Sequence, residues 1–368
     1  MEKKKIVHII QSLDNGGCEN MLLRTLPLLQ AFDHIVITLK DPGELAPQFT
    51  SVGITVETIH CDGFYDISGI RRLRTVIHTK QPSIIITYLF HADMIGRMGL
   101  YNVTNAPVIP FLRTTYNHPK YLIARIVEWL TKPLVKQYLA NSEAVKDFYT
   151  KHIGVRPEKI TVIPNGIDTD YFDSILPDPN LRESLGISSD NFVIICVANL
   201  HINKGHRYLL EAFETIYQKY PETHLLIVGD GRERDNLKNQ IKEYQSKNNI
   251  SFLGRRTDVP QLLKISDCFV LPTLFEGQSN ALMEAMASGL PVITTDIPEN
   301  RNLVENNTSG FLVPIKNSTA LSEAIQKIYK ELKTKKTFSE KAKNTIHNFF
   351  SLEKIATKWE DTLVKMTD

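Results

Sequence analysis

Short apolar runs rich in valine and isoleucine recur along this chain, and longer amphipathic stretches separate most of them. In the first half we predict strands over residues 5–10, 34–39, 54–59, 83–88, 107–112, 137–140 and 160–163. In the second half the runs are 192–198, 224–228, 250–253, 268–271, 292–295 and 310–313. Runs that are apolar throughout are typical of parallel strands buried on both faces. The pattern therefore predicts an α/β protein with two doubly wound sheets.

Amphipathic spacing predicts the helices between these runs, and examples are residues 19–31, 68–79, 205–219, 280–287 and 351–366. Residues 165–190 carry Asn, Gly, Asp, Pro and Ser and no clear strand, which indicates a linker. We therefore expect an N-terminal domain over residues 1–170 and a C-terminal domain over 185–350. Two such domains place the natural ligand site in the cleft between them, at the carboxyl ends of the strands.

Composition excludes several classes of protein. The 368 residues carry a formal net charge of +2, so the chain lacks the basic excess of a nucleic-acid-binding protein. Its four cysteines lie far apart without CxxC spacing, which excludes a zinc knuckle and fits a reducing cytoplasm. The apolar stretch near the start is too short for a signal peptide, and no run approaches 18 apolar residues. We expect a cytoplasmic protein.

Paired glycines follow the first predicted strand, at Gly16 and Gly17. Glycines at this point let backbone N–H groups approach an anion at a helix N-terminus, although a plain tight turn explains them equally well. Neither a GxGxxG nor a GxxxxGK[ST] pattern occurs, so an NAD fingerprint and a P-loop are unsupported.

Two further loops follow strands of the second half. Lys204 and Gly205 open a helix after the first of these strands, where a lysine can meet a diphosphate as a point charge. A solvated lysine at a helix start is the alternative. Gly229 and Gly231 permit a turn against a ligand, but such turns are common.

The most informative segment is 275–291. Glu276 lies on the loop after the strand 268–271, and Ser279 is a good N-cap for the helix 280–287. Glu284 lies inside this otherwise apolar helix, so we expect it to be buried. A buried carboxylate needs hydrogen bonds, which the hydroxyls of a ligand would supply. An arginine or lysine from elsewhere, or water at the edge of the helix, would also serve.

Together these motifs resemble those of the retaining glycosyltransferases of family 4, which belong to the GT-B group. Glu276 and Glu284 match the Glu-x7-Glu signature of that family, and the other matching motifs lie at residues 164–168, 204–205, 229–231 and 252–254. The resemblance implies two Rossmann-like domains with a nucleotide-sugar cleft between them. It also implies that the C-terminal helix, residues 351–368, packs back on the first domain.

The resemblance assigns roles to individual residues. Glu284 would hydrogen-bond the ribose hydroxyls, and Glu276 would lie beside the transferred sugar. Lys204 and the Gly17 amide would neutralise the diphosphate leaving group. His91 would reach the donor sugar. Gly16 of the glycine turn would also contact the donor, and Arg255 and Arg256 would lie near the base. The backbone N–H groups of Gln278, Ser279 and Asn280 would hold sugar hydroxyls or phosphate.

The chain departs from the family pattern at two points. Asn199 stands where the family often has arginine, and His201 stands where a related pattern has one. The second phosphate cation is therefore a protonated His201, the nearby Arg113, or absent. Gln278 replaces the usual phenylalanine, which leaves the donor sugar open.

Family members of this type need no metal, so we expect no cofactor beyond the co-substrate, with a UDP-sugar favoured. Asp168 and Asp170 resemble a metal-binding DxD pair, but they belong to the motif at 164–168. They would be the ligands if a metal were required.

The acceptor is expected on the first domain, which is mildly basic. Residues 121–136 carry apolar side chains at Leu122, Ile123, Ile126, Trp129 and Leu130 with basic residues around them. This pattern indicates either a helix lying on a membrane surface or a packed core helix. A lipid-linked saccharide is the leading acceptor, and whether the protein lies at the inner face of the membrane stays open.

The sequence thus predicts a retaining, metal-independent glycosyltransferase that moves a hexosyl-type sugar from a nucleotide-diphosphate sugar to a saccharide or lipid-linked saccharide in bacterial-type surface glycan synthesis. Two alternatives remain. One is a GT-B nucleotide-sugar epimerase, in which this Glu-x7-Glu spacing is not expected. The other is a non-catalytic nucleotide-sugar-binding protein, which should lack slow hydrolysis of the donor.

Overall fold

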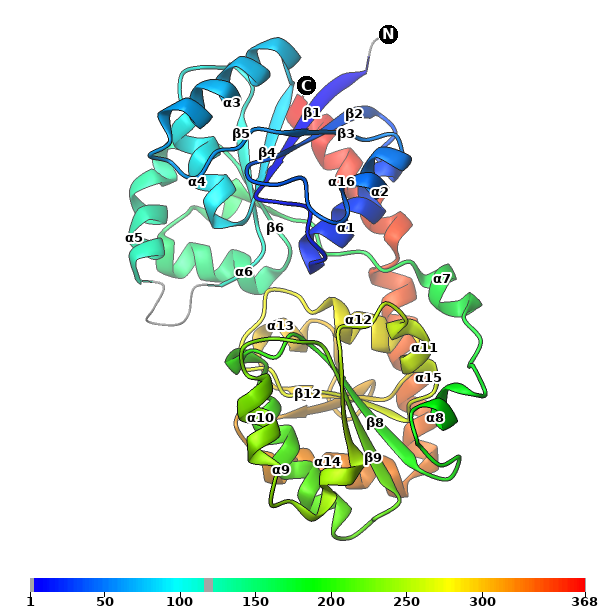
Figure 1. Ribbon diagram of the computed structural model, residues 1–368. Coiled ribbons are helices and arrows are strands. Elements are labelled where there is room, and N and C mark those ends of the chain that lie inside the picture. Colours follow the sequence, from blue (N-terminus) through cyan, green and yellow to red (C-terminus); the bar gives the residue numbers. More distant parts are fainter. Residues whose placement is uncertain (1–2, 116–121, 368) are drawn as a thin grey trace. The chain divides into compact units, whose positions relative to one another are not determined.

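The computed structural model describes residues 3–115 and 122–367 (Figure 1). The chain divides into two compact units. The first runs to Gly166 and takes up the C-terminal segment from Leu352, and the second is Ile167–Ser351. Each unit is built on one parallel sheet.

The first unit contains a sheet of seven described strands in the order β3-β2-β1-β4-β5-β6-β7. Their bounds are β1 (Lys4–Ile10), β2 (Phe32–Thr38), β3 (Thr55–Thr58), β4 (Ile84–Tyr88), β5 (Val108–Leu112), β6 (Tyr138–Ala140) and β7 (Ile160–Val162). The central strand β1 pairs in parallel on both sides, with Val7 opposite Ile35 of β2 and Ile85 of β4. Every described strand lies within two residues of a predicted apolar run, because burial on both faces requires a continuous apolar segment.

Helices cover both faces of this first sheet. One face carries α1 (Gly17–Thr25), α2 (Ala46–Ser51) and α16 (Leu352–Thr367), and the other carries α3 (Ile67–Lys80) and α4 (Leu89–Gly99). Two further helices, α5 (Leu122–Thr131) and α6 (Glu143–Phe148), follow β5 and β6. The alternation of side chains along β1 sends Ile6 and Ile10 into one core and Val7 and Ile9 into the other.

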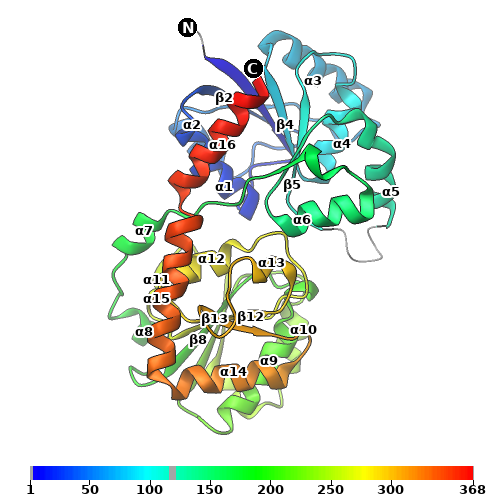
Figure 2. The same cartoon turned by 180° about the vertical axis from the view of Figure 1, so that it is seen from behind.

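The C-terminal helix α16 belongs to the first unit (Figure 2). Its Trp359 is fully buried and meets Phe111 of β5 edge to face, with ring centroids 5.4 Å apart. Ile355 and Leu363 lie in the same core. The last residues of the chain therefore complete a core that begins at its first strand.

The second unit contains a sheet of six described strands in the order β10-β9-β8-β11-β12-β13. These are β8 (Phe192–Val197), β9 (Thr223–Val228), β10 (Ile250–Gly254), β11 (Cys268–Leu271), β12 (Val292–Thr295) and β13 (Gly310–Val313). The helices are α9 (His206–Tyr217), α10 (Arg234–Gln240), α11 (Val259–Lys264), α12 (Asn280–Ala287), α13 (Pro298–Arg301), α14 (Ser318–Lys330) and α15 (Leu332–Phe349). Both units are thus Rossmann-like, as the apolar pattern predicts.

The segment predicted as a linker folds onto the second unit instead. It contains two short helices, α7 (Thr169–Ser174) and α8 (Leu181–Ser184). Ile167 and Phe172 are buried in the core of that unit. Ile187 is buried in the same core, and Leu181 and Leu185 pack against it. These apolar side chains are spaced irregularly among polar residues, so they give no periodic signal in the sequence.

Among residues 3–115 and 122–367, no helix is both long and apolar enough to cross a bilayer.

Candidate functional site

Lys204 and Glu276 form an ion pair at the carboxyl edge of the second sheet. Lys204 lies on the loop after β8, and Glu276 lies on the loop after the neighbouring strand β11. Both side chains are largely buried, with 20% and 10% exposed. Backbone contacts join the two loops, since Leu274 N donates to Asn203 O at 2.7 Å and Thr273 Oγ1 donates to the same oxygen at 3.1 Å. The structure therefore brings together two residues that were predicted from separate motifs.

Gly205 allows this close approach. Its φ is +68°, and a Cβ there would lie 2.1 Å from the carbonyl oxygen of Pro272. A side chain would strain the backbone and push the two loops apart. The glycine of the Lys204–Gly205 motif is thus required by packing, whichever ligand the lysine meets.

A second carboxylate, Glu299, belongs to this site and was missed by the sequence analysis. It lies in the first turn of α13, after β12, and is 6% exposed. Burial raises its pKa to about 7, and the negative charge of Glu276 adds to that shift. The only feature of the sequence that could have indicated this position is Pro298, which favours the start of a helix just after a predicted strand.

Helix α12 has the predicted bounds, and Ser279 caps it by accepting a hydrogen bond from Leu282 N at 3.3 Å. Glu284 is half-buried rather than fully enclosed, so it lies at the edge of the helix. Asn280, Glu284 and Ser288 lie four residues apart and form the partly exposed stripe of a helix whose other faces are buried. Glu284 is thus on the same side of the helix as Asn280, one turn from its N-terminus.

The glycines at 229 and 231 serve contacts between loops. A Cβ on Gly229 would lie 2.1 Å from Ala198 O, and one on Gly231 would lie 2.3 Å from Leu200 O. The chain after β9 therefore packs directly on the chain after β8, with Leu200 N donating to Asp230 O at 3.0 Å.

The other predicted donor-binding residues of the second unit lie on different loops and differ in exposure. Asn199 is exposed. His201 is half-buried, and its Nδ1 donates to Asn203 Oδ1 at 2.8 Å. Arg256 pairs with Asp258 at the start of α11, with Nε 2.7 Å from Oδ1, while Arg255 is exposed after β10. The structure thus gives Arg256 a partner of its own and leaves Arg255 the accessible member of the pair.

The first unit gathers Gly16, Glu19, Arg113 and Asn165 at the carboxyl edge of its own sheet. Gly16 is the N-cap of α1, and a Cβ there would lie 2.4 Å from a carboxylate oxygen of Glu19. Arg113 follows β5, donates from Nη2 to Asn165 Oδ1 at 2.9 Å and stacks on Phe111. Burial raises the pKa of Glu19, and the charge of Arg113 opposes this shift. Arg113 thus lies close to the glycine loop predicted to meet the diphosphate, beside Gly17 in the first turn of α1.

His91 lies in the first turn of α4, after β4, and its side chain is exposed. Because β4 and β5 are adjacent strands, His91 and Arg113 leave the same edge of the first sheet at neighbouring positions.

The Asp168–Asp170 pair has a structural explanation. Asp168 is the N-cap of α7 and accepts a hydrogen bond from Tyr171 N at 2.9 Å. A carboxylate at an N-cap stabilises the helix without any metal.

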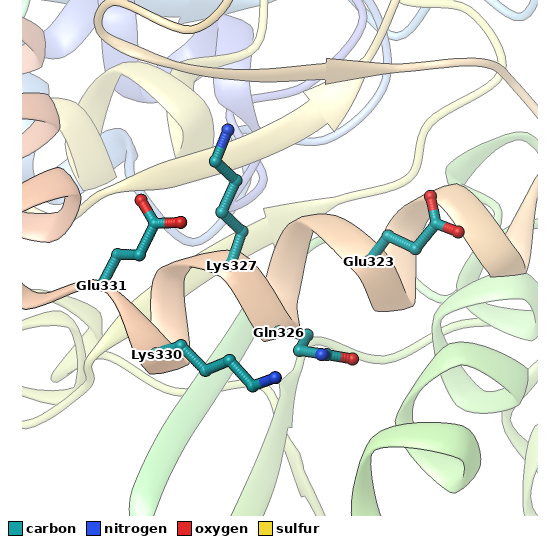
Figure 3. Close-up of a pocket in the computed structure, with 5 residues that line it drawn as sticks. All are labelled: Glu323, Gln326, Lys327, Lys330 and Glu331. Carbon is teal, nitrogen blue, oxygen red and sulfur yellow. The ribbon is translucent and has the colours of Figure 1, made fainter.

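A hollow of about 240 Å³ lies on the outer side of α14 (Figure 3). It is lined by Glu323, Gln326, Lys327, Lys330 and Glu331, and none of the predicted site residues contributes to it. Lys327 and Lys330 extend over the rings of Phe311 and Tyr220. These long side chains cover aromatic surface, so the hollow has an ordinary structural origin.

Comparison with protein families matches both halves of the chain. The model described as "Glycosyltransferase Family 4" matches residues 15–171, and the one described as "Glycosyl transferases group 1" matches residues 177–345.

Individual proteins agree with this. The UDP-Gal:alpha-D-GlcNAc-diphosphoundecaprenol alpha-1,3-galactosyltransferase of Escherichia coli is 35% identical over 311 residues, which cover 82% of this chain and 80% of that protein. The capsular polysaccharide biosynthesis glycosyltransferase CapM of Staphylococcus aureus is 26% identical over 81% of this chain and 80% of its own. Anabaena Alr3699/HepE, solved in complex with UDP-glucose, superposes with a TM-score of 0.87 at 24% identity, covering 98% of this chain and 99% of that one. The chain therefore belongs to glycosyltransferase family 4 and has the GT-B fold.

Proposed function

We propose that this glycosyltransferase transfers a hexosyl group from a nucleotide-diphosphate sugar, with UDP the favoured nucleotide, to a lipid-diphosphate-linked saccharide. The observation that carries the proposal is the ion pair between Lys204 and Glu276 at the carboxyl edge of the second sheet. The E. coli relative, whose name specifies UDP-Gal and a GlcNAc-diphosphoundecaprenol acceptor, supports the choice of donor and acceptor. The product would be an intermediate of a bacterial-type surface glycan, assembled at the cytoplasmic face of the membrane.

Lys204 is the group that meets the leaving diphosphate. Departure of the diphosphate concentrates negative charge on its oxygens, and a fixed cation is worth most at that moment. Without the donor, Lys204 is held by Glu276. A bound diphosphate competes for the ammonium group and frees the Glu276 carboxylate to accept hydrogen bonds from the sugar hydroxyls.

The reaction proceeds with retention of configuration. The bond between the anomeric carbon and the diphosphate oxygen breaks, and its electron pair leaves with the diphosphate. The acceptor hydroxyl bonds to the same face of that carbon and gives its proton to the departing oxygen, which lies beside it. Glu284 holds the ribose, and N–H groups at the start of α12 hold the sugar or phosphate.

No metal takes part in this proposal. Lys204 supplies the charge that a divalent cation would otherwise supply, and Asp168 acts as a helix cap. Turnover should therefore survive excess chelator. If chelator abolished turnover and Mg²⁺ or Mn²⁺ restored it, the proposal would be contradicted, and Asp168 and Asp170 would be the candidate metal ligands.

The test is transfer from UDP-galactose and, in parallel, other UDP-hexoses to a detergent-dispersed GlcNAc-diphosphate-lipid, with the anomeric configuration of the product read by NMR. Lys204→Ala should lower kcat about 10²–10³-fold. Glu284→Ala should weaken binding of UDP by roughly 1.5–3 kcal/mol, with a smaller loss for Glu284→Gln. A β-linked product from an α-linked donor, or an unchanged kcat in Lys204→Ala, would contradict the mechanism.

A further inference from the structure

We propose that the outer face of α5 is a membrane-docking surface that binds bilayers containing anionic lipids. The proposal rests on the proposed function in one respect: docking would bring the first unit to a lipid-linked acceptor. The surface itself is defined by exposed side chains of this chain.

Helix α5 presents a stripe of large apolar side chains to the outside. The exposed fractions are 76% for Ile123, 61% for Leu130 and 55% for Trp129. Leu122 and Ile126 complete the stripe, and Leu134, in the 3-10 turn that follows the helix, is also exposed. Their spacing of three and four residues places them on one side of the helix. A continuous exposed stripe of this size marks an interaction surface rather than a scatter of surface residues.

The opposite side of α5 is fixed to the unit by a buried ion pair. Glu128 is 1% exposed, and its Oε2 lies 2.7 Å from Nη1 of Arg97 on α4. Tyr149 donates to the other oxygen of Glu128 at 3.2 Å, and Nη1 of Arg97 also donates to Thr131 at 3.1 Å. Rotating the helix to hide its apolar stripe would break these buried contacts, which is costly. The stripe is therefore held outward.

The charges around the stripe select its partner. Between residues 122 and 136 the one acidic residue is Glu128, which faces inward, and the basic residues are Arg125, Lys132 and Lys136. Arg125 is half-buried with its guanidinium over the ring of Phe148, so the two lysines carry the positive charge beside the stripe. Lys132 is half-buried and donates to Ile153 O at 3.0 Å, with Nζ 5.5 Å from the centroid of the Trp129 ring, whereas Lys136 is exposed. An apolar stripe with tryptophan and basic neighbours fits the boundary between acyl chains and anionic headgroups.

A second copy of the chain fits this surface less well. A twofold contact would place the same patch on both sides, so the basic residues would face one another. Anionic lipid instead pairs with them, and the apolar side chains enter the acyl region.

A second exposed apolar group, Phe64, Tyr65 and Ile67, lies where the chain enters α3. Helix α3 follows β3, and three strands (β2, β1 and β4) separate β3 from β5 in the sheet. The group at α3 is therefore a separate patch and is not part of the docking surface proposed here.

The test uses the full chain and flotation with vesicles of phosphatidylcholine alone or with 30% phosphatidylglycerol. Wild type should bind the anionic vesicles, and binding should weaken as salt rises. Ile123→Gln/Leu130→Gln should reduce binding at least about tenfold, and Lys136→Gln should reduce it a few-fold on anionic vesicles only. The matched control is Leu176→Gln/Phe349→Gln, which replaces equally exposed apolar residues of the second unit and should bind like wild type.

Three results would overturn the docking surface: wild type that binds neither vesicle, a double variant that binds like wild type, or a wild-type dimer that the double variant converts to a monomer. Transfer to the detergent-dispersed acceptor separates this proposal from the proposed function. The Ile123→Gln/Leu130→Gln variant should keep wild-type transfer there. Absence of transfer by wild type would count against the proposed function and leave the vesicle result standing.

Discussion

At the residue scale, Glu299 shows how burial beside a second carboxylate changes a titration. Burial raises its pKa from 4.5 to about 7, with Glu276 adding to the shift. Between pH 4.5 and 7 the folded chain keeps a proton that the unfolded chain has lost. Stability therefore falls as pH rises through this window and stays lower above it.

We expect Glu299→Gln to remove this loss of stability at high pH. The variant should gain stability relative to wild type on the order of 2 kcal/mol at pH 8 and little at pH 5, measured by denaturant unfolding at both pH values. Glu305→Gln, at an exposed position, is the control and should show no such dependence. An equal difference at both pH values would show that Glu299 titrates normally.

His206, next to the Lys204–Gly205 turn, titrates in the opposite sense. It is 2% exposed, and neither ring nitrogen has a hydrogen-bond partner among the described residues. Burial lowers its pKa to about 4, and the nearby positive charge of Lys204 contributes. The folded chain thus excludes a proton that the unfolded histidine binds below pH 6.5.

Stability should consequently fall as pH drops from 6.5 toward 4, and His206→Leu should reduce this fall by about 1.4 kcal/mol per pH unit, the effect of one proton. The measurement is the free energy of unfolding between pH 7 and 5. His78→Gln, at an exposed position on α3, serves as control. A pH slope that His206→Leu leaves unchanged would assign the proton uptake to other groups.

At the scale of elements, the strands were predictable and the buried polar contacts between helices were not. A strand that is buried on both faces consists of one continuous apolar run, so each strand can be recognised from its own short stretch of sequence. The sequence analysis expected Glu284 to be buried because the rest of its helix is apolar, whereas the structure places it half-buried on the side that it shares with Asn280 and Ser288. Glu299 was missed because Glu276, whose charge acts on it, lies on another loop. The pair of Arg97 with Glu128 was missed because the two residues lie on different helices, α4 and α5.

The network around Arg97 is the clearest such contact. Arg97 Nε donates to Asp93 Oδ1 at 2.7 Å within α4, and Nη1 pairs with Glu128 of α5. Burial raises the pKa of Glu128 to about 7, although Arg97 opposes this shift. Removing the arginine leaves two buried carboxyl groups without their cation.

Arg97→Met should therefore cost about 3–5 kcal/mol of unfolding free energy. Lys151→Met is the matched control, because Lys151 and Asp147 form an ion pair of the same helical spacing, at 2.9 Å, on the surface. It should cost less than about 0.5 kcal/mol. Equal losses in urea titrations of the two variants would show that burial does not set the strength of these pairs.

At the scale of the whole molecule, the chain crosses from the first unit to the second and returns with α16. Each unit has its own cores, and the core of the first includes Trp359 from the C-terminal helix. A chain with two such units need not unfold in one step. The stability of the first unit thus depends on a helix that follows the whole second unit in the sequence.

Trp359→Ala should destabilise the first unit by about 3–5 kcal/mol through the cavity it leaves against Phe111. Hydrogen exchange should then speed up in β1, β4 and β5 while β8, β11 and β12 keep their protection. Phe213→Ala, which opens a cavity in a core of the second unit, should give the reverse pattern. Both variants remove a large buried aromatic side chain, so they can be compared directly. Uniform loss of protection across both sheets in either variant would show that the two units unfold together and that α16 couples their stabilities.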